Sequence, residues 1–471
     1  MEVRVRIGPS PTGVPHIGVT RTALFNFLFA KHQKGKFILR IEDTDRARFV
    51  PESIPKILEI LKFLNLVWDK GPIFQSERLS IYQEYAKKLI DVRAAYFCFC
   101  TPQRLAKLRA ELEKKGKPGK YDRLCLSLSK TEINKKIVGR EKHVIRLKIP
   151  NGGKTNWHDL IHGKIEFENK LLDDSVLLKS DGFPTYHLAV VVDDHLGGIT
   201  HVLRGDEWIS STPKHLILYE YFGWKPPNFA HLPIVLGQDK TKLSKRHGAK
   251  SVLEYRDEGY LPEALINFMA LLGWSPSSRR SRSGGGLKEQ DIFTLDELIR
   301  KFDLKDINPT SPIFNLEKFN WFNKQWIMRL DDGDIVKRLE NFIPKKWDRR
   351  LVKKVIPLVK ERITTLADFV NWINFFFEEP KPDFGKLGKN VIKDVLNKLE
   401  SNFNTLSNWN FLKIEEAARK AIEDIEPRVA FEILRIATTG KKVGPPLFES
   451  LEILGKDKVL ERIKKSVKST S

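Results

Sequence analysis

Short apolar runs and helical segments alternate through the first 95 residues of the chain, and this alternation constrains the fold more than any other feature. Strands that alternate with helices build βαβ units around a parallel sheet. The segment therefore predicts one half of a Rossmann-like, doubly wound α/β domain. Its strands are expected over 3–7 and 37–41, and its helices over 20–31 and from Ser53 and Ser80 onward.

The strand and helix pattern breaks off near residue 96 and returns near residue 185. Between these points the segments are shorter and the loops more polar, which is typical of an α+β insertion. The pattern returns with the apolar run Leu188 to Val192, which is expected to be a strand buried on both faces of the sheet. The α/β domain is thus expected to be split into residues 1–95 and 185–240, with residues 96–184 inserted between them.

The second half of the sequence is helical and basic. Apolar residues recur with the helical period over 391–399, 415–425 and 459–467, so that each stretch can bury one face. An all-α C-terminal half is therefore expected. A segment rich in Ser, Arg and Gly at 275–286 is predicted to be a mobile loop, with contacts from its arginines to phosphate as the alternative.

The length and charge of the chain limit the classes of protein to which it can belong. Its 471 residues are enough for roughly two to four domains. The 82 lysines and arginines exceed the 60 aspartates and glutamates and give a net charge of +22, which favours a polyanionic partner such as nucleic acid or an acidic membrane face. We find no apolar run of the ~18 residues that cross a bilayer as a helix and no targeting segment. Three cysteines suit a reducing compartment, so a cytoplasmic protein without a membrane segment is expected.

The loop Pro9 to Val19 (PSPTGVPHIGV) follows a predicted strand and precedes a predicted helix. Phosphates bind at this position in a doubly wound sheet, beside the N-terminus of a helix. Gly13 and Gly18 let the backbone approach a ligand closely, and His16 offers a hydrogen-bond donor to a phosphate oxygen. The loop is therefore a candidate ATP-binding element, with an ordinary turn that carries an incidental histidine as the alternative.

A second candidate element is the basic segment Lys242 to Arg246 (KLSKR), which lies in a stretch too polar to be part of a core. Its lysines, Lys242 and Lys245, suit a clamp on a triphosphate that neutralises charge as pyrophosphate leaves. Taken alone, the segment could equally be a solvated basic loop. Its meaning depends on its pairing with the loop at 9–19.

Together and in this order, the two segments resemble the paired signature motifs of class I aminoacyl-tRNA synthetases. Val19 and KLSKR depart from the HIGH and KMSKS forms of these motifs, and both departures fit the glutamyl subgroup. The resemblance narrows to bacterial-type glutamyl-tRNA synthetases, because further segments match in the same order. They are RIEDTDRAR at 40–48, PTYHLAVVVDDH at 184–195, HVLRGDEW at 201–208, GYLPEALINF at 259–268 and, more weakly, GKKVGPPLFESLEILGK at 440–456.

This resemblance implies a glutamate–tRNA ligase that uses ATP and Mg²⁺ to form glutamyl-adenylate. The glutamyl group would then pass to the terminal adenosine of tRNA(Glu). The resemblance also implies a monomer in which the insertion at 96–184 binds the acceptor stem. Residues 241–320, with the KLSKR loop, would contact the tRNA stem, and residues 321–471 would bind the anticodon.

The same resemblance assigns roles to individual residues. Glutamate has two carboxylates and one ammonium, so its pocket needs cations, hydrogen-bond donors and an anion. The implied glutamate ligands are Arg6 and Arg204 for the side-chain carboxylate, Glu42 for the ammonium, and Ser10 and Tyr186. The implied catalytic residues are His16, Lys242 and Lys245. The implied ATP ligands are Gly13, His16, Gly18, Glu207, Trp208, Val235, Leu236 and Lys245.

All three cysteines, Cys98, Cys100 and Cys125, fall in the insertion. Structural zinc takes four ligands, and the spacing resembles a zinc site that some glutamyl enzymes have in this region. The fourth ligand would stand two residues after Cys125, where this chain has Ser127, a poor ligand. Tyr121 could take its place, as a tyrosine does in some relatives. A structural zinc ion and three ordinary buried thiols are the two alternatives.

Rival functions share this fold. One is a glutaminyl enzyme or a non-discriminating enzyme that also glutamylates tRNA(Gln), and another is a catalytically inactive tRNA-binding paralogue. Arg204 favours glutamate as the amino acid, because a planar guanidinium distinguishes a carboxylate from a neutral amide. The presence of His16, Glu42, Lys242 and Lys245 argues against an inactive protein.

Overall fold

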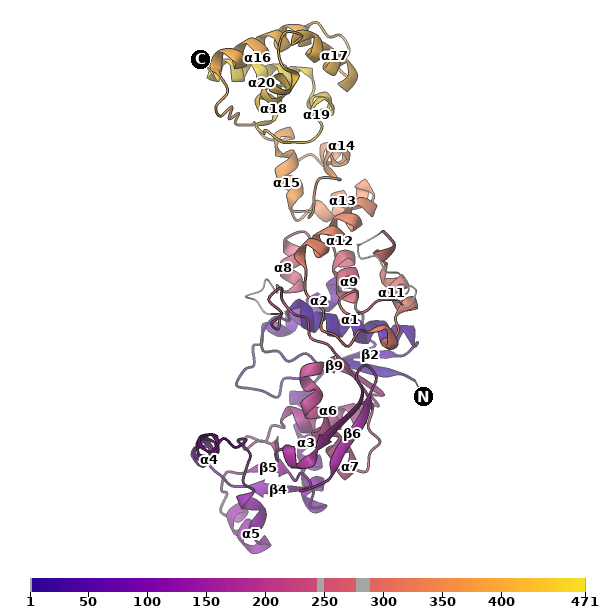
Figure 1. The fold of residues 1–471 in the computed structure, drawn as a ribbon, viewed down its shortest axis with the longest axis vertical. Helices are drawn as coiled ribbons and strands as arrows, with labels where there is room; N and C mark the ends of the chain where they lie inside the picture. The colour runs from indigo at the N-terminus through magenta and orange to yellow at the C-terminus, as the bar shows by residue number, and fades with distance from the viewer. Residues whose placement is uncertain (1, 244–249, 277–288, 471) are drawn as a thin grey trace. The chain divides into compact units, whose positions relative to one another are not determined.

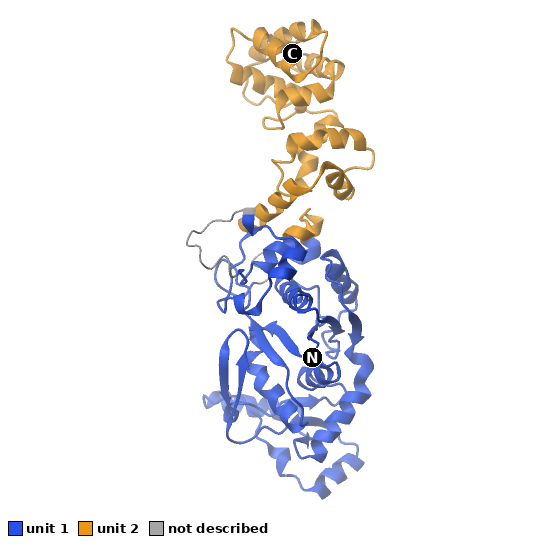
Figure 2. Ribbon diagram, turned by 90° about the vertical axis from the view of Figure 1, so that its right-hand side faces the viewer, with its two compact units in different colours: residues 1–254, 265–316 blue, residues 255–264, 317–471 orange. Residues whose placement is uncertain are grey.

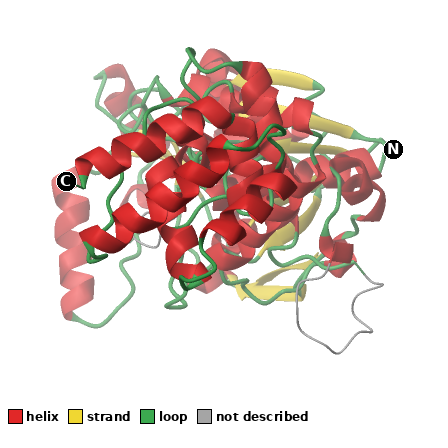
Figure 3. Cartoon of the chain, turned by 90° about the horizontal axis from the view of Figure 1, so that it is seen from above, coloured by secondary structure: helices red, strands yellow, loops and turns green. Residues whose placement is uncertain are grey.

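The structure is a computed structural model that describes residues 2–243, 250–276 and 289–470 of the chain (Figure 1). The chain forms two compact units (Figure 2): unit 1 comprises residues 1–254 and 265–316, and unit 2 comprises residues 255–264 and 317–471. Every strand in the described part of the chain (yellow in Figure 3) belongs to unit 1. The prediction of an α/β region and a helical C-terminal half is thus confirmed. From residue 277 onward, the predicted loop at 275–286 lies outside the described residues.

The main sheet of unit 1 is built in two parts. In the first, β1 (Arg4–Ile7), β2 (Lys36–Ile41) and β3 (Lys70–Phe74) run parallel in the order β1-β2-β3. In the second, the order is β7 (Gly163–Glu168), β6 (Lys154–Asp159), β10 (Asn228–Leu232) and β9 (His201–Gly205), with β6, β10 and β9 parallel. The two parts meet where the Thr200 amide donates to the Arg4 carbonyl at 2.9 Å. Strands β1 and β9 therefore lie side by side.

Helix α1 (Ile17–His32) packs against β1, β2 and β9. It begins at Ile17 and is capped by His16, and its last turn carries Lys31 and His32, basic side chains that oppose the negative end of the helix dipole. Its apolar residues, such as Leu24 and Phe25, are fully buried, which fixes the loop before it against the sheet. The other main helices of unit 1 are α2 (Ser53–Phe63), α3 (Leu79–Asp91), α7 (Thr212–Tyr221) and α11 (Leu295–Lys301). Helices α8 (Val252–Asp257) and α9 (Pro262–Ala270) each contain residues of both units.

The strand predicted at 188–192 is wrong, because these residues belong to helix α6 (Tyr186–Leu196). The run is buried where α6 packs against α3 and α7. A helix buried all round is as uniformly apolar as a strand buried on both faces, so periodicity cannot separate the two. As a consequence, Asp193 and Asp194 lie near the end of a helix rather than beyond the end of a strand.

The predicted insertion contains a small antiparallel sheet. Its strands are β4 (Ala95–Cys98), β5 (Val144–Leu147) and β8 (Val176–Leu178), in the order β4-β5-β8. Helices α4 (Pro102–Lys114) and α5 (Lys130–Val138) lie between β4 and β5 in the sequence. Strands β6 and β7 also fall within 96–184, but they extend the main sheet, in which Asp159 is paired with Phe229. The range 96–184 thus supplies strands to both sheets.

Unit 2 consists of helices, and the apolar faces of those from residue 389 onward share a core that includes Leu399, Phe403 and Ile463. The amphipathic stretches predicted at 391–399 and 459–467 lie within α16 and α20, and the stretch at 415–425 extends beyond the end of α17. No helix in the described part of the chain is long and apolar enough to span a membrane. The helices are α12 (Leu316–Arg329), α13 (Asp332–Leu339), α14 (Arg349–Val359), α15 (Asp368–Ile373), α16 (Lys389–Asn404), α17 (Phe411–Ala421), α18 (Pro427–Thr439), α19 (Leu447–Leu454) and α20 (Lys456–Ser469).

Gly259 of unit 2 occupies a position that a side chain would disrupt. Its φ is +87°, and a Cβ there would lie 2.6 Å from the backbone nitrogens of Leu366 and Ala367. We expect Gly259→Ala to lower the free energy of unfolding by about 2–4 kcal/mol, because left-handed strain adds to a backbone clash. Gly116 also has a positive φ, +63°, but nothing within 4 Å of a Cβ, so Gly116→Ala should cost only about 1–2 kcal/mol. Equal losses for the two variants in urea unfolding would contradict the clash.

Candidate active site

A cavity of about 610 Å³ opens in unit 1 at the carboxyl ends of β1, β2, β9 and β10. Ligands bind at this edge in open α/β sheets. Most residues that the sequence suggested line the cavity, whereas Gly13 and Leu236 do not, and Lys245 lies outside the described residues. The suggested residues in its wall are Arg6, Ser10, His16, Gly18, Glu42, Tyr186, Arg204, Glu207, Trp208, Val235 and Lys242.

His16 stands at the start of α1, where its side chain caps the helix. Its Nδ1 atom accepts a hydrogen bond from the Gly18 amide at 3.1 Å, so the neutral ring has its proton on Nε2. Burial lowers the pKa of His16, and the nearby Lys242 lowers it further. The imidazole is therefore neutral and presents an N–H donor at a helix N-terminus, where phosphate oxygens bind well.

The first two residues of the KLSKR segment lie in the cavity wall. The Leu243 amide donates to the Val235 carbonyl at 2.9 Å, and Lys242 Nζ lies 3.4 Å from Glu207 Oε1. These charged side chains are about half exposed, and such pairs contribute little stability, so the ion pair can open toward another anion. The rest of the motif, 244–246, lies outside the described residues.

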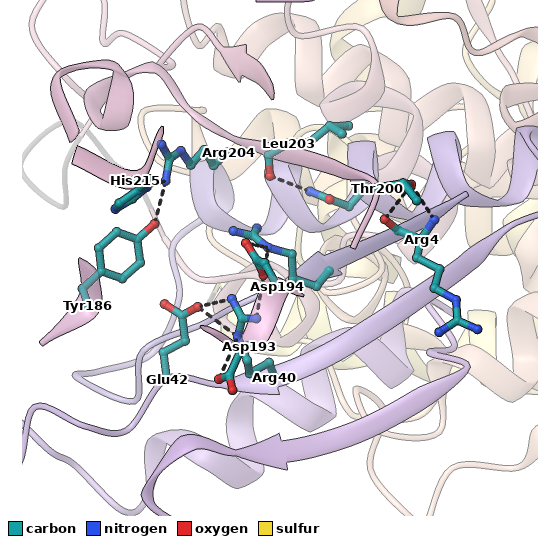
Figure 4. A network of polar contacts seen from close by, with 12 residues as sticks. Arg4, Arg40, Glu42, Tyr186, Asp193, Asp194, Thr200, Leu203, Arg204 and His215 are labelled. Atoms are coloured by element: carbon teal, nitrogen blue, oxygen red, sulfur yellow. Dashed lines mark hydrogen bonds and ion pairs between the residues drawn. The ribbon is translucent and has the colours of Figure 1, made fainter. Parts of the chain in front are cut away.

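Arg6 from β1 and Arg40 from β2 share the carboxylate of Asp194 from α6. Figure 4 shows Arg40 beside Asp194. Asp194 accepts from Arg6 Nε at 3.0 Å and from Arg40 Nη1 at 2.7 Å. Burial raises the pKa of the Asp194 carboxyl, but the two guanidinium groups outweigh burial and lower it below its usual range. The charge of Arg6 is therefore compensated within the protein.

Glu42 carries the second carboxylate of this cluster. All its side-chain hydrogen bonds among the described residues are made by Oε1, which accepts from Arg40 Nη2 at 2.9 Å. The other oxygen points away from Arg40 in Figure 4. Burial raises the pKa of Glu42, against the opposing effect of Arg40. A carboxylate with one oxygen held and the other directed away from its partner can accept hydrogen bonds from a ligand's ammonium group.

Arg204, at the end of β9, is only 5% exposed, and its hydrogen-bond partners are all neutral. Nη1 donates to Tyr186 Oη at 3.0 Å and to His215 Nδ1 at 3.2 Å. Nη2 donates to Thr212 Oγ1 at 2.8 Å, and Nε to His231 Nε2 at 3.1 Å. Within the described part of the chain, no carboxylate forms an ion pair with Arg204. A buried cation without a counter-charge favours the binding of an anion.

The histidines around Arg204 do not add to its charge. Burial lowers the pKa of His215 well below its usual value, and Arg204 lowers it further. Burial also lowers the pKa of His231, against the opposing effect of Asp159, and it lowers the pKa of His187 to about 4. An anion bound here would therefore meet the one full positive charge of Arg204.

The three cysteines converge in the insertion. The Sγ atoms of Cys98, Cys100 and Cys125 lie within 4.8 Å of one another. The hydroxyl of Tyr121 lies 3.4 Å from Cys98 Sγ and 3.3 Å from Cys100 Sγ. Ser127 is exposed and donates instead to a backbone carbonyl at 2.8 Å. Three thiols thus meet at one point with a phenol oxygen beside them, and zinc binds thiolates well.

Four residues of the site were not identified from the sequence: Arg40, Asp194, His215 and His231. A signal existed for two of them, since Arg40 and Asp194 stand within the motif segments 40–48 and 184–195. Their partnership joins residues 154 positions apart, which no local pattern reveals. His215 and His231 lie in no motif, and only the fold brings them to Arg204.

The cavity is lined by two groups of side chains with different chemistry. His16 and Lys242 provide donors suited to phosphate, whereas Arg204 and Glu42 provide a cation and an anion suited to a small charged molecule. On a doubly wound sheet, this arrangement defines a nucleotide-dependent enzyme that acts on a small carboxylate.

Comparison with known proteins specifies this class. Residues 2–321 match the family "tRNA synthetases class I (E and Q), catalytic domain", and residues 334–467 match an anticodon binding domain. The chain belongs to this family of class I tRNA synthetases, as the sequence motifs predicted.

Its relatives match along almost their entire length. Glutamate–tRNA ligase 1 of Caldanaerobacter subterraneus subsp. tengcongensis is 42% identical over 480 residues, which cover 99% of this chain and 98% of the relative. Glutamate–tRNA ligase of Dehalococcoides mccartyi is 42% identical over 488 residues, with 98% and 97% covered. The crystal structure of a glutamate tRNA ligase from Elizabethkingia meningosepticum, in complex with its amino acid, has a TM-score of 0.89 at 35% identity and covers both chains fully.

Proposed function

We propose that this protein is a glutamate–tRNA ligase, which activates L-glutamate with ATP and transfers the glutamyl group to tRNA(Glu). Relatives named glutamate–tRNA ligase are 42% identical over nearly the whole chain. The choice of amino acid rests on Arg204, a buried guanidinium in the cavity wall whose described partners are all neutral. Such a cation binds the side-chain carboxylate of glutamate and rejects the amide of glutamine.

The other pocket residues complete this recognition. Within the described residues, the side-chain hydrogen bonds of Arg6 come only from Nε, so its Nη donors remain for the side-chain carboxylate, alongside Tyr186. The free oxygen of Glu42 accepts from the glutamate ammonium, and Ser10 lines the same cavity. The pocket thus meets the side-chain carboxylate of glutamate with cations and its ammonium with an anion.

In the first step, an oxygen of the substrate α-carboxylate attacks the α-phosphorus of ATP, and pyrophosphate leaves. His16, Lys242 and Lys245 offset charge on the phosphates, so the protein acts by positioning and electrostatics rather than as a nucleophile. Mg²⁺ enters with ATP and is held mainly by phosphate oxygens. The remaining proposed ATP ligands are Gly13, Gly18, Glu207, Trp208, Val235 and Leu236.

In the second step, the 2′-hydroxyl of the terminal adenosine attacks the glutamyl carbonyl, and AMP leaves. We propose that residues 96–184 bind the acceptor stem of the tRNA, that residues 241–320 contact its stem, and that residues 321–471 bind its anticodon. The net charge of +22 favours binding of a polyanion of this kind. One chain carries all the residues that we assign to the reaction, so we propose a monomer. We also propose that it is cytoplasmic.

Charging of separately purified glutamate and glutamine tRNAs tests this function. We expect glutamylation of tRNA(Glu), together with glutamate-dependent ATP–pyrophosphate exchange in the presence of tRNA. Glutamylation of tRNA(Gln) as well would identify a non-discriminating enzyme. Charging with glutamine, or no exchange with either amino acid, would contradict the proposal.

We also propose that Cys98, Cys100, Cys125 and Tyr121 hold a structural zinc ion that takes no part in the reaction. We expect about one zinc per purified chain, because three thiols already meet at one point. Cys125→Ser should remove the zinc and lower the thermal stability of the insertion, whereas Ser127→Ala, the matched control, should leave zinc content unchanged. Metal content by mass spectrometry measures both. Zinc-free wild-type protein with three titratable thiols would favour the alternative of ordinary buried cysteines.

A further inference from the structure

Asp159, His231 and Arg204 form a buried line across three neighbouring strands. Strands β6, β10 and β9 are consecutive in the sheet. His231 is in register with Arg204, and Asp159 is in register with Phe229, two residues before His231. Asp159 and His231 are 0% exposed, and neither is among the residues that line the cavity. Their link to the cavity is the hydrogen bond from Arg204, which lines the cavity, to His231.

The hydrogen bonds of this line have fixed directions. An arginine can only donate, so His231 Nε2 accepts from Arg204 Nε at 3.1 Å. The neutral ring then carries its proton on Nδ1, which donates to Asp159 Oδ2 at 2.5 Å. Asp159 Oδ1 accepts from the backbone amides of Ile161 and His162 at 3.0 and 3.2 Å. The carboxylate therefore cannot turn, and it holds the imidazole in one tautomer.

We infer that Asp159 is a positioning residue for glutamate recognition, which acts through His231 to hold the guanidinium of Arg204 in one orientation. The inference rests on the proposed function, because it concerns the same carboxylate pocket. Arg204 has no counter-charge among the described residues to fix it, so neutral acceptors set its direction. Of these, only His231 is in turn held by a carboxylate, Asp159.

The inference predicts what an amide at position 159 would do. An asparagine keeps the oxygen that accepts the backbone amides, but its NH₂ group donates to His231 Nδ1. The ring proton then moves to Nε2, where the Thr212 hydroxyl, 3.1 Å away, accepts it. Arg204 Nε is left without its acceptor. The guanidinium turns, and its positive charge leaves the position in the cavity wall that suits the carboxylate of glutamate.

The test is steady-state charging by Asp159→Asn. We expect KM for glutamate to rise about tenfold or more, with kcat at saturating glutamate within about threefold of wild type, because a ground-state contact is lost. Discrimination against glutamine should fall by about the same factor. KM for ATP and the Kd for tRNA should not change. Adding His231→Gln should not restore KM, because the amide NH₂ at position 159 donates to the glutamine carbonyl and so turns the glutamine NH₂ group toward Arg204 Nε.

Asp174→Asn is the matched control. Asp174 is also buried and pairs with Arg123 at 2.7 Å, but it lies in the insertion and does not line the cavity. We expect this variant to lose stability and keep the wild-type KM for glutamate. A KM shift of equal size in the control would mean that any buried carboxylate lost from unit 1 has this effect, and it would overturn the inference.

Wild-type KM in soluble Asp159→Asn would overturn the inference as well. If Asp159→Asn does not fold, His231→Gln and His231→Leu provide the test in its place. The glutamine variant should charge with nearly wild-type KM and the leucine variant with a raised KM, and equal values would overturn the inference. Failure of the wild-type protein to charge glutamate would instead contradict the proposed function, so the two failures are distinguishable.

Discussion

Replacement of Arg204 by alanine is expected to lower kcat/KM for glutamate by about a thousandfold or more, while tRNA binding stays close to wild type. The guanidinium is buried, bound only to neutral groups among the described residues, and directed into the cavity. Its removal leaves the side-chain carboxylate of glutamate without a counter-charge where water is largely excluded. Initial rates of tRNA charging and a gel-shift titration with tRNA measure the two quantities.

Two further variants sharpen this result. Arg204→Lys keeps the charge but lacks the planar pair of donors, so its kcat/KM should fall between those of wild type and Arg204→Ala. Arg4→Ala is the control, because Arg4 lies in the same sheet, has a half-buried side chain and pairs with Glu2. It should charge as wild type does. Unchanged kcat/KM in Arg204→Ala would refute the assignment of the carboxylate pocket.

Replacement of Asp194 by asparagine is expected to lower the free energy of unfolding of unit 1 by about 3–5 kcal/mol at pH 7. The change leaves Arg40 with the carboxylates of Glu42 and Asp193 and leaves Arg6 without an ion pair among the described residues. An uncompensated charge in the interior costs far more than an exposed one. Urea unfolding measures the loss of free energy, and amide hydrogen exchange shows whether it falls on β1 and β2.

The sign of the pH dependence gives a second readout. The folded-state pKa of Asp194 lies below its usual value, so its stabilisation is complete above the unfolded-state pKa and is lost as the pH falls through the folded-state pKa. Asp194→Asn should therefore differ most from wild type at neutral pH and least in acid. Glu84→Gln is the control, because its pair with Lys88 is largely exposed, and its effect should stay within about 0.5 kcal/mol. Similar losses in both variants would contradict the role given to burial.

The sequence predicts the elements of the first half of unit 1 well because their signals are local. Strands β1 and β2 and helix α1 begin and end within a few residues of their expected bounds, whereas strand β3 was not predicted. Helix α6 is the exception, since its burial on all sides removes the polar face that would have indicated a helix. The hairpin of β6 and β7 was not distinguished from the rest of the insertion, because strand pairing with β10 is a long-range contact.

The sequence by itself determines which functional groups are present, and the loop at 9–19, the KLSKR segment, Glu42 and the two arginines already indicate the family. Only the tertiary structure decides which of those arginines keeps an uncompensated charge. Helix α6 brings Asp194 to Arg6 across 188 positions of the sequence, whereas β10 brings neutral His231 to Arg204. Counter-charges act over a few ångströms, and the order of residues along a chain does not record such distances. The charge of the pocket is therefore a property of the fold.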